Sequence, residues 1–313
     1  MLDIQKDTFG PLLTLRRAFS ALSGRKFDRS TLGILLLLPL AVVLLGLIAY
    51  PIISAVYLSL HNKSAGSPGI FVGLKNYVDL LTIDSVLFDV LANTILYATV
   101  SVAFKVFFGL VMAMVLNEAI PARNFFRGWL LLPWIAPVLV TALTWRWMFN
   151  QNGGIINFLL LSMGLVHIPP AWLATSAMAR AALIIANVWR GFPFFGVTLL
   201  AGLQSIPMEL YEAAEMDGAS IWQRIRHITL PWLEPIIWTI VILSTIWTFN
   251  DFTLVWFLTG GGPSNATQLF ATYSYQIGFL GSELGYAAAV SLVGTPLMIL
   301  LIIALAPRMW KEQ

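Results

Sequence analysis

Between two long apolar segments the chain carries the twenty-residue sequence EAAEMDGASIWQRIRHITLP, at positions 212–231. Glutamates recur every three residues at positions 209, 212 and 215. Because acidic groups near a helix N-terminus favour the helix dipole, these glutamates predict a helix over 208–217. Gly218 then ends it, since glycine readily adopts a left-handed backbone. A basic segment over 220–227 follows, so the sequence predicts a helix–glycine–helix element.

Two readings fit such an element. An amphipathic helix can rest on lipid headgroups, with its apolar side in the membrane interface. Alternatively, the element can dock a partner protein. Acidic side chains such as Glu209, Glu212 and Glu215 suit an anionic lipid surface poorly, and therefore the docking role is favoured.

The composition of the remaining chain is that of a membrane protein. Of 313 residues, 58% are hydrophobic and 11% are charged, and the mean hydropathy is +0.82. Soluble domains carry about twice that charged fraction. The absence of cysteine excludes disulfides and thiolate metal sites. The net charge of +3 comes without an aromatic-interleaved basic stripe, which argues against nucleic acid as a partner.

Six apolar segments are each long enough to cross about 30 Å of hydrocarbon as a helix. Only helices satisfy their own backbone groups within a single segment in lipid. The sequence therefore predicts an all-α polytopic membrane protein with six transmembrane helices. We place them near residues 31–60, 89–116, 128–149, 179–204, 233–258 and 284–306.

The charged leader before the first span could also belong to a cleaved signal peptide. Its apolar run is too long for that, and no small-residue cleavage site follows. The expectation is a retained signal-anchor. The chain then divides into a cytoplasmic N-terminal segment (1–30), a transmembrane domain (31–306) that includes the loop at 207–231, and a cytoplasmic tail (307–313).

The distribution of Lys and Arg predicts the orientation. Twelve of them fall in the N-terminal segment, the loops at 117–127 and 205–232, and the C-terminal tail. Only Lys63 and Lys75 fall in the loops of the opposite side. The positive-inside rule therefore places both termini in the cytoplasm.

Seven residues of the 212–231 element keep the spacing of a known motif: Glu212, Ala213, Ala214, Gly218, Ile228, Leu230 and Pro231. The motif resembles the EAA loop of binding-protein-dependent ABC import permeases. The resemblance implies that the loop, including Asp217, is a cytoplasmic coupling helix that sits in a groove of an ATPase subunit. It also implies that Glu212 anchors the loop by charge and that Gly218 permits a sharp bend.

The resemblance runs from about residue 30 to the end and is closest to the maltose-type carbohydrate permeases. Further matching landmarks lie at 132–137, 187–193, 249–252 and 259–263. The resemblance implies the type I ABC importer permease fold in a bacterial inner membrane. It further implies a second permease, usually a different chain, and two ABC subunits that bind ATP and Mg, with no cofactor on this chain. A periplasmic sugar-binding protein would dock on loops 61–88, 150–178 and 259–283.

Polar and aromatic residues are rare in spans and tend to face a cavity or a partner. Here they concentrate in the third, fourth and fifth spans, and the mixture suits sugars, which stack on aromatic faces and hydrogen-bond to short polar groups. Proline at 133, 137 and 193 would loosen these helices. Carried over from the family, the substrate-lining positions are Trp134, Val138, Asn187, Arg190, Gly191, Phe194, Trp247, Thr248, Asp251 and Thr253.

Three of these positions depart from the maltose-type pattern. Val138 replaces a hydroxyl residue, Asp251 replaces an amide, and Arg190 replaces an apolar residue. An Arg190–Asp251 pair could bridge the cavity, or Arg190 could recognise an anionic group such as a phosphate, sulfonate or uronate. Individual members of the set could also serve only helix packing. Lys105, in mid-span, reads as a residue that snorkels or pairs within the bundle.

The sequence argues against two other functions, a membrane enzyme and an ion-coupled secondary transporter. A membrane enzyme would need catalytic groups, but no paired carboxylates, nucleophile elbow, metal cluster or phosphate loop occurs. The glycines at 260–262 lack the Lys-Ser/Thr of an ATP-binding loop. An ion-coupled secondary transporter would need buried titrating acids and an internal repeat. Asp251 is the lone strong candidate for such an acid, and the six spans show no convincing internal duplication. The importer reading is therefore preferred.

Overall fold

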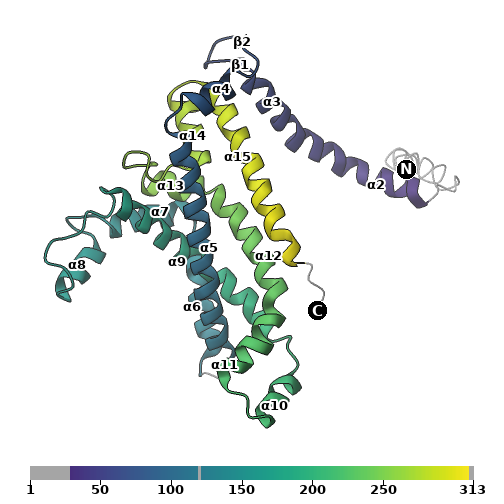
Figure 1. Ribbon diagram of the computed structural model, residues 1–313, viewed down its shortest axis with the longest axis vertical. Helices are drawn as coiled ribbons and strands as arrows, with labels where there is room; N and C mark the ends of the chain where they lie inside the picture. Colours follow the sequence, from purple (N-terminus) through teal and green to yellow (C-terminus); the bar gives the residue numbers. More distant parts are fainter. Residues whose placement is uncertain (1–28, 119–120, 310–313) are drawn as a thin grey trace, which may run out of the picture. The chain divides into compact units, whose positions relative to one another are not determined.

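The computed structural model describes residues 29–118 and 121–309 (Figure 1). Most of the expected N-terminal segment (1–30) and the last four residues of the expected tail (307–313) lie outside this part. The chain divides into two compact units, with the boundary after Ser54. Each unit is described by itself.

The first unit contains most of one apolar helix, and the boundary after Ser54 falls within the last section of that helix. Helix α2 (Arg29–Leu44) continues through a π-helical turn, η1 (Leu45–Ala49), into α3 (Tyr50–Ser59). Its section Leu36–Ser59 has 24 residues and a mean hydropathy of 2.6. That length is sufficient to cross a bilayer, as expected for the first span.

The second unit is built around four long helices. These are α5 (Leu87–Asn117), α9 (Ser176–Leu203), α12 (Leu230–Phe249) and α15 (Leu284–Leu305). The most extensive pair is α5 with α9. Glycines make this approach close: a Cβ on Gly109 would collide with Phe195, and a Cβ on Gly196 would collide with the Met112 side chain. Small residues at a helix–helix interface are the usual device in membranes, where packing replaces the hydrophobic effect.

The predicted third span is not a single helix. It consists of α6 (Arg123–Ile135) and α7 (Val138–Met148), which are bent by 91° at the break between them. Ala136 has an extended ψ of 135° before Pro137, because a residue before proline disfavours the helical conformation. The structure thus has five helices that could span a membrane among its described residues, or six if the bent pair is one span.

The fifth span begins and ends earlier than predicted. Helix α11 (Ile221–Arg224) continues through the π-helical turn η2 (Ile225–Thr229) into α12, so one helix runs from Ile221 to Phe249. Ser220 caps its start, reciprocally with Gln223. The helix ends before Asp251, whose side chain caps α13 (Phe252–Leu258). The basic half of the helix–glycine–helix element is therefore part of the spanning helix.

Short elements gather at the two ends of the second unit (Figure 1). One end, called here the hairpin end, carries the antiparallel pair β1 (His61–Asn62) and β2 (Ile70–Phe71), with α4 (Lys75–Thr82) and α14 (Phe270–Tyr275). The opposite end, called the α10 end, carries α10 (Met208–Met216) and α11. The remaining short helices are α8 (Ile155–Ser162), η3 (Gln276–Leu280) and η4 (Ala306–Met309). Apart from the two-residue strands, the architecture is the expected all-α one.

Candidate functional site

A polar cavity lies within the second unit where α5, α6, α9 and α12 meet. Its volume is about 80 Å³, enough for a few water molecules. Eight of the ten predicted substrate residues line it: Trp134, Asn187, Arg190, Gly191, Phe194, Trp247, Thr248 and Asp251. Three further residues complete the lining: Lys105, Phe195 and Ser244.

Asp251 is tied into the wall of this cavity by hydrogen bonds. Its Oδ2 accepts one from the hydroxyl of Tyr97 at 2.7 Å and one from Nδ2 of Asn187 at 2.9 Å. Its Oδ1 accepts from the backbone N–H of Leu254 at 3.3 Å, which caps α13. The carboxylate thus holds α5, α9 and α13 together.

Lys105 is the residue of the cavity that sequence reasoning missed. It is only 5% exposed, and its Nζ donates to Thr248 Oγ1 at 3.0 Å and to Ser244 Oγ at 3.3 Å. A Cβ on Gly191 would lie 2.5 Å from Lys105 Cε and 3.2 Å from its Nζ. Because Gly191 has no side chain, the side chain of Lys105 can cross α9 at this position. Of the two readings offered by the sequence, pairing within the bundle is the correct one.

Arg190 lies next to this lysine, and one of its hydrogen-bond donors is unpaired within the described residues. Within the described residues, its buried Nε has no hydrogen-bond partner, and neither has Oδ1 of Asn187. Nor do the ion pairs of the described chain include one between Arg190 and Asp251. Of the two possibilities left open for Arg190, the pair with Asp251 is not seen among the described residues, where Tyr97 and Asn187 hold the acid instead.

Three aromatic side chains form one side of the cavity. The rings of Trp134 and Phe194 stack with centroids 5.8 Å apart and planes 21° apart. Trp247 meets Phe194 edge-on at 5.4 Å. Trp134 is 43% exposed and Trp247 is 54% exposed. The aromatic side is therefore an open rim of this chain.

Two predicted residues are not part of the lining. Val138, the first residue of α7, is half-buried and packs against the cluster that contains Tyr97, Trp145 and Leu254. Thr253 is half-buried within α13. The break between α6 and α7 separates Val138 from Trp134, which an unbroken helix would have placed one turn apart.

At the α10 end, residues 212–231 form the end of α10, a turn at Gly218 and the start of the spanning helix. Glu212, Ala213 and Asp217 are exposed, and Gly218 has φ +78°. Around the turn, Met216 is 88% exposed and Trp222 is 79% exposed. Ile228, Leu230 and Pro231 lie in the helix that follows, and Ala214 is half-buried. Large apolar side chains this exposed favour contact with another molecule.

Two side-chain contacts hold α10 to the spanning helix. The hydroxyls of Tyr211 and Thr229 lie 2.9 Å apart, and Glu215 Oε2 lies 3.5 Å from Arg224 Nη1. The ion pair is largely exposed on the glutamate side and so contributes little to stability. The hydroxyl contact, in which Thr229 is only 4% exposed, is the firmer of the two attachments.

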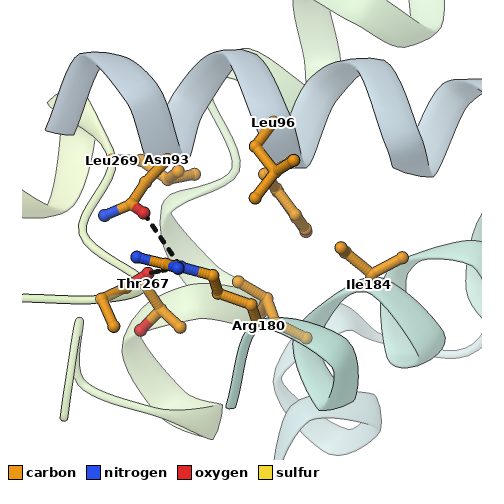
Figure 2. A pocket seen from close by; sticks show the side chains of 9 residues that line it. Asn93, Leu96, Arg180, Ile184, Thr267 and Leu269 are labelled. Atoms are coloured by element: carbon orange, nitrogen blue, oxygen red, sulfur yellow. Dashed lines mark hydrogen bonds between the residues drawn. The ribbon is translucent and has the colours of Figure 1, made fainter. Parts of the chain in front are cut away.

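Toward the hairpin end, Arg180 fastens the glycine-rich loop at 259–269 to the bundle (Figure 2). Its Nε donates to Oδ1 of Asn93 at 3.1 Å and to the carbonyl of Ala266 at 2.9 Å. Nδ2 of Asn93 in turn donates to the carbonyl of Asn265 at 2.8 Å. One arginine on α9 thus joins α5 and this loop. Among the described residues, no group of three or more His, Asp or Glu could hold a metal ion.

Comparison with known proteins assigns the family. Residues 105–310 match the model of the family described as "Binding-protein-dependent transport system inner membrane component". The chain is similar to the trehalose/maltose transport system permease protein MalF of Thermococcus litoralis, with 38% identity over 86% of this chain and 90% of that protein. It is also similar to the sulfoquinovosyl glycerol transport system permease protein SmoG of Agrobacterium fabrum, with 35% identity over 84% and 85%.

Solved structures show the same fold. A bacterial ABC transporter involved in the import of the acidic polysaccharide alginate superposes with a TM-score of 0.78 and 22% identity. The alignment covers 95% of this chain and 100% of that one. The same alginate transporter in complex with its alginate pentasaccharide-bound periplasmic protein gives a TM-score of 0.77 over 88% and 93%. With the family model and these relatives, the chain belongs to the inner-membrane permease components of binding-protein-dependent transport systems, and it has the type I ABC importer permease fold.

Proposed function

We propose that this chain is one of two permease subunits of an ATP-driven importer, and that it translocates a di- or oligosaccharide, or a derivative of one. A periplasmic binding protein would deliver the sugar. The observation that carries the proposal is the cavity, where an aromatic rim adjoins buried hydrogen-bonding groups.

The chemistry of the cavity suits a sugar. The faces of Trp134 and Trp247 are exposed for stacking, which is how aromatic rings bind the apolar side of a pyranose. Oδ1 of Asn187 and Nε of Arg190 are buried without hydrogen-bond partners within the described residues, and sugar hydroxyls would supply such partners. Relatives named for trehalose/maltose and for sulfoquinovosyl glycerol support a glycoside as cargo.

The open rim supports a second permease. A cavity of about 80 Å³ is smaller than a disaccharide needs. A second permease facing the exposed Trp134 and Trp247 would complete a larger chamber between the two chains. Substrate contacts would then be divided between them.

The exposed α10 end supports coupling to a separate ATPase. Met216 and Trp222 would fill an apolar groove of an ABC subunit, and the exposed Glu212 would anchor the contact by charge. The ABC subunits, not this chain, would bind ATP and Mg. In this arrangement the α10 end and both termini lie in the cytoplasm, and the hairpin end faces the binding protein.

The test is sugar uptake into proteoliposomes that contain the complete importer with its binding protein. We expect uptake to require ATP and to continue when ion gradients are collapsed. Glu212→Lys should reduce uptake and ATPase stimulation by about tenfold or more, because a charge reversal at an interface removes attraction and adds repulsion. Glu209→Lys, on the same exposed helix, is the matched control. Full uptake and stimulation with Glu212→Lys, or gradient-driven uptake without ABC subunits, would refute the proposal.

A further inference from the structure

The cavity contains an uneven set of charges. Lys105 and Arg190 are basic, and Asp251 is the one acid among its lining residues. The acid is occupied by hydrogen bonds from Tyr97 and Asn187 and by the cap of α13. It forms no ion pair with either base in the part of the chain that the structure describes.

The two basic groups have only neutral partners or none. The ammonium of Lys105 contacts two hydroxyls, those of Ser244 and Thr248. The Nε of Arg190 is buried without a hydrogen-bond partner among the described residues. A buried cation that lacks a counter-charge is costly. Two cations against one anion leave a positive charge that no ion pair within the described residues neutralises.

The two cations also share one wall of the cavity. The stem of Lys105 crosses directly over Gly191, the residue that follows Arg190 on α9. Arginine offers a planar fork of donors to a carboxylate, phosphate or sulfonate, and lysine adds a compact charge with three donors. Side by side on one wall, they can both contact a single anionic group.

We propose that Lys105 and Arg190 form a binding site for a single anionic group on the transported sugar, such as a uronate carboxylate or a sulfonate. Lys105 is then a specificity-determining residue. The aromatic rim binds the sugar ring, and the two bases select for its charge. This inference rests on the proposed function and specifies the class of its substrate.

Substitutions at Lys105 and Asp251 should change the preference for an acidic sugar in opposite directions. These opposite changes distinguish an anion-binding site from a structural network. Lys105→Met removes one cation and keeps the apolar stem, so it should weaken the preference for an acidic sugar. Asp251→Asn removes the acid and keeps an acceptor for Tyr97 or Asn187, so it should strengthen that preference. A purely structural network would lose binding of acidic and neutral sugars alike in both variants.

The experiment measures direct binding to the complete importer in nanodiscs, without the binding protein. The probes are a glucuronosyl-glucose disaccharide and the glucosyl-glucose disaccharide of the same linkage. We expect the wild type to bind the acidic probe about tenfold or more tightly than the neutral one, as for a hydrogen-bonded charge. Lys105→Met should reduce this difference, since only Arg190 remains, and Lys105→Arg should preserve more of it. Lys75→Met, which removes an exposed cation at the hairpin end, should leave it unchanged.

Equal binding of the two probes by the wild type, or binding of neither, would overturn the proposal. Equal binding is also the result expected if an acidic side chain of the second permease neutralises Lys105 and Arg190. An unchanged preference in Lys105→Met would exclude Lys105 from the site even if the wild type prefers the acidic probe. The proposed function is tested by a separate experiment, which is ATP-dependent uptake of any sugar.

Discussion

Gly191 shows how a missing side chain can shape a site. Because its Cβ would lie 2.5 Å from Lys105 Cε, Gly191→Ala must displace the lysine or separate α5 from α9. Overpacking of this kind costs about 1–3 kcal/mol. We expect a lower thermal midpoint for the purified complex and weaker binding in the cavity.

The matched control is Gly128→Ala. Gly128 also lies inside a helix, α6, but nothing lies within 4 Å of the position of its Cβ. This variant should be neutral or slightly stabilising, since alanine favours a helix over glycine by about 1 kcal/mol. Equal destabilisation by both substitutions would show that the contact with Lys105 is not the cause.

Asp84 supports a second prediction, at the hairpin end. Its Oδ2 accepts hydrogen bonds from the hydroxyls of Tyr273 at 2.7 Å and Tyr286 at 2.9 Å. Burial, and then the hydrogen bond to Asp84, raise the pKa of Tyr273 well above its ordinary value. Tyr273→Phe should lower stability by about 1–3 kcal/mol, the usual contribution of a hydrogen bond to a charged group.

The pH dependence has a definite sign. A raised tyrosine pKa means that the folded state keeps the proton that the unfolded state releases near pH 10. The stabilisation by Tyr273 is therefore complete at neutral pH and declines as pH rises above about 10. Thermal midpoints of wild type and Tyr273→Phe should converge there. A constant gap from pH 7 to pH 11 would contradict this account.

The lining residues illustrate which functions a sequence reveals. Asn187, Arg190, Trp247 and Asp251 could be found because polar and aromatic groups stand out within apolar spans. Lys105 could not be assigned, because its partners Ser244 and Thr248 lie 139 and 143 residues away. A single lysine in an apolar helix carries no sign of which helix it faces. The contact depends on the tertiary packing of α5, α9 and α12.

Among the elements, the turn after α10 places the strictest requirement on backbone conformation. Gly218 has φ +78° and open space around its missing Cβ, so the constraint there is conformational and not steric. Gly218→Ala should cost about 1–2 kcal/mol in the turn, whereas Gly218→Asn should cost less, since asparagine tolerates this region. ATPase stimulation should fall in the order Gly, Asn, Ala. An alanine variant as active as the wild type would mean that the bend is not needed.

Element boundaries were less predictable than element existence. Hydropathy locates the apolar segments, but it leaves the basic residues Arg224, Arg226 and His227 outside the fifth span, although they lie within the helix that runs from Ile221 to Phe249. It also reads through the 91° break before Val138, because the residues on both sides are equally apolar. Proline alone does not decide, since α9 continues through Pro193 while Pro137 marks the break between α6 and α7.

Within the second unit, a few polar contacts join elements that lie far apart in the sequence. Arg180 joins α9 to Asn93 on α5 and to the loop at 259–269. Arg180→Gln should leave the bundle assembled but loosen this loop. Hydrogen exchange should quicken at the amides of Ala266 and Thr267, by about tenfold if one hydrogen bond of about 1.5 kcal/mol is lost. Arg146→Gln, at an exposed arginine with one long contact to Phe257, should leave exchange there unchanged.

The assembled transporter was beyond what the chain alone could reveal. The fold class follows from the apolar segments, the family from the 212–231 motif, and most of the lining residues from the resemblance to that family. What covers the exposed faces of Trp134 and Trp247 does not follow from them. The sequence determines how the helices of this chain pack against one another. The exposed aromatic rim is the feature of the cavity that indicates a further contact surface.

The unbroken helix from Ile221 to Phe249 has a mechanical consequence. Its 29 residues make a rod about 40 Å long at 1.5 Å per residue. Ser220 caps one end next to the Gly218 turn, and Ser244, Trp247 and Thr248 lie near the other. A tilt of about 5° at the first end displaces the far end by about 4 Å. A rigid tilt of this rod would therefore couple the width of the cavity to the position of the Gly218 turn.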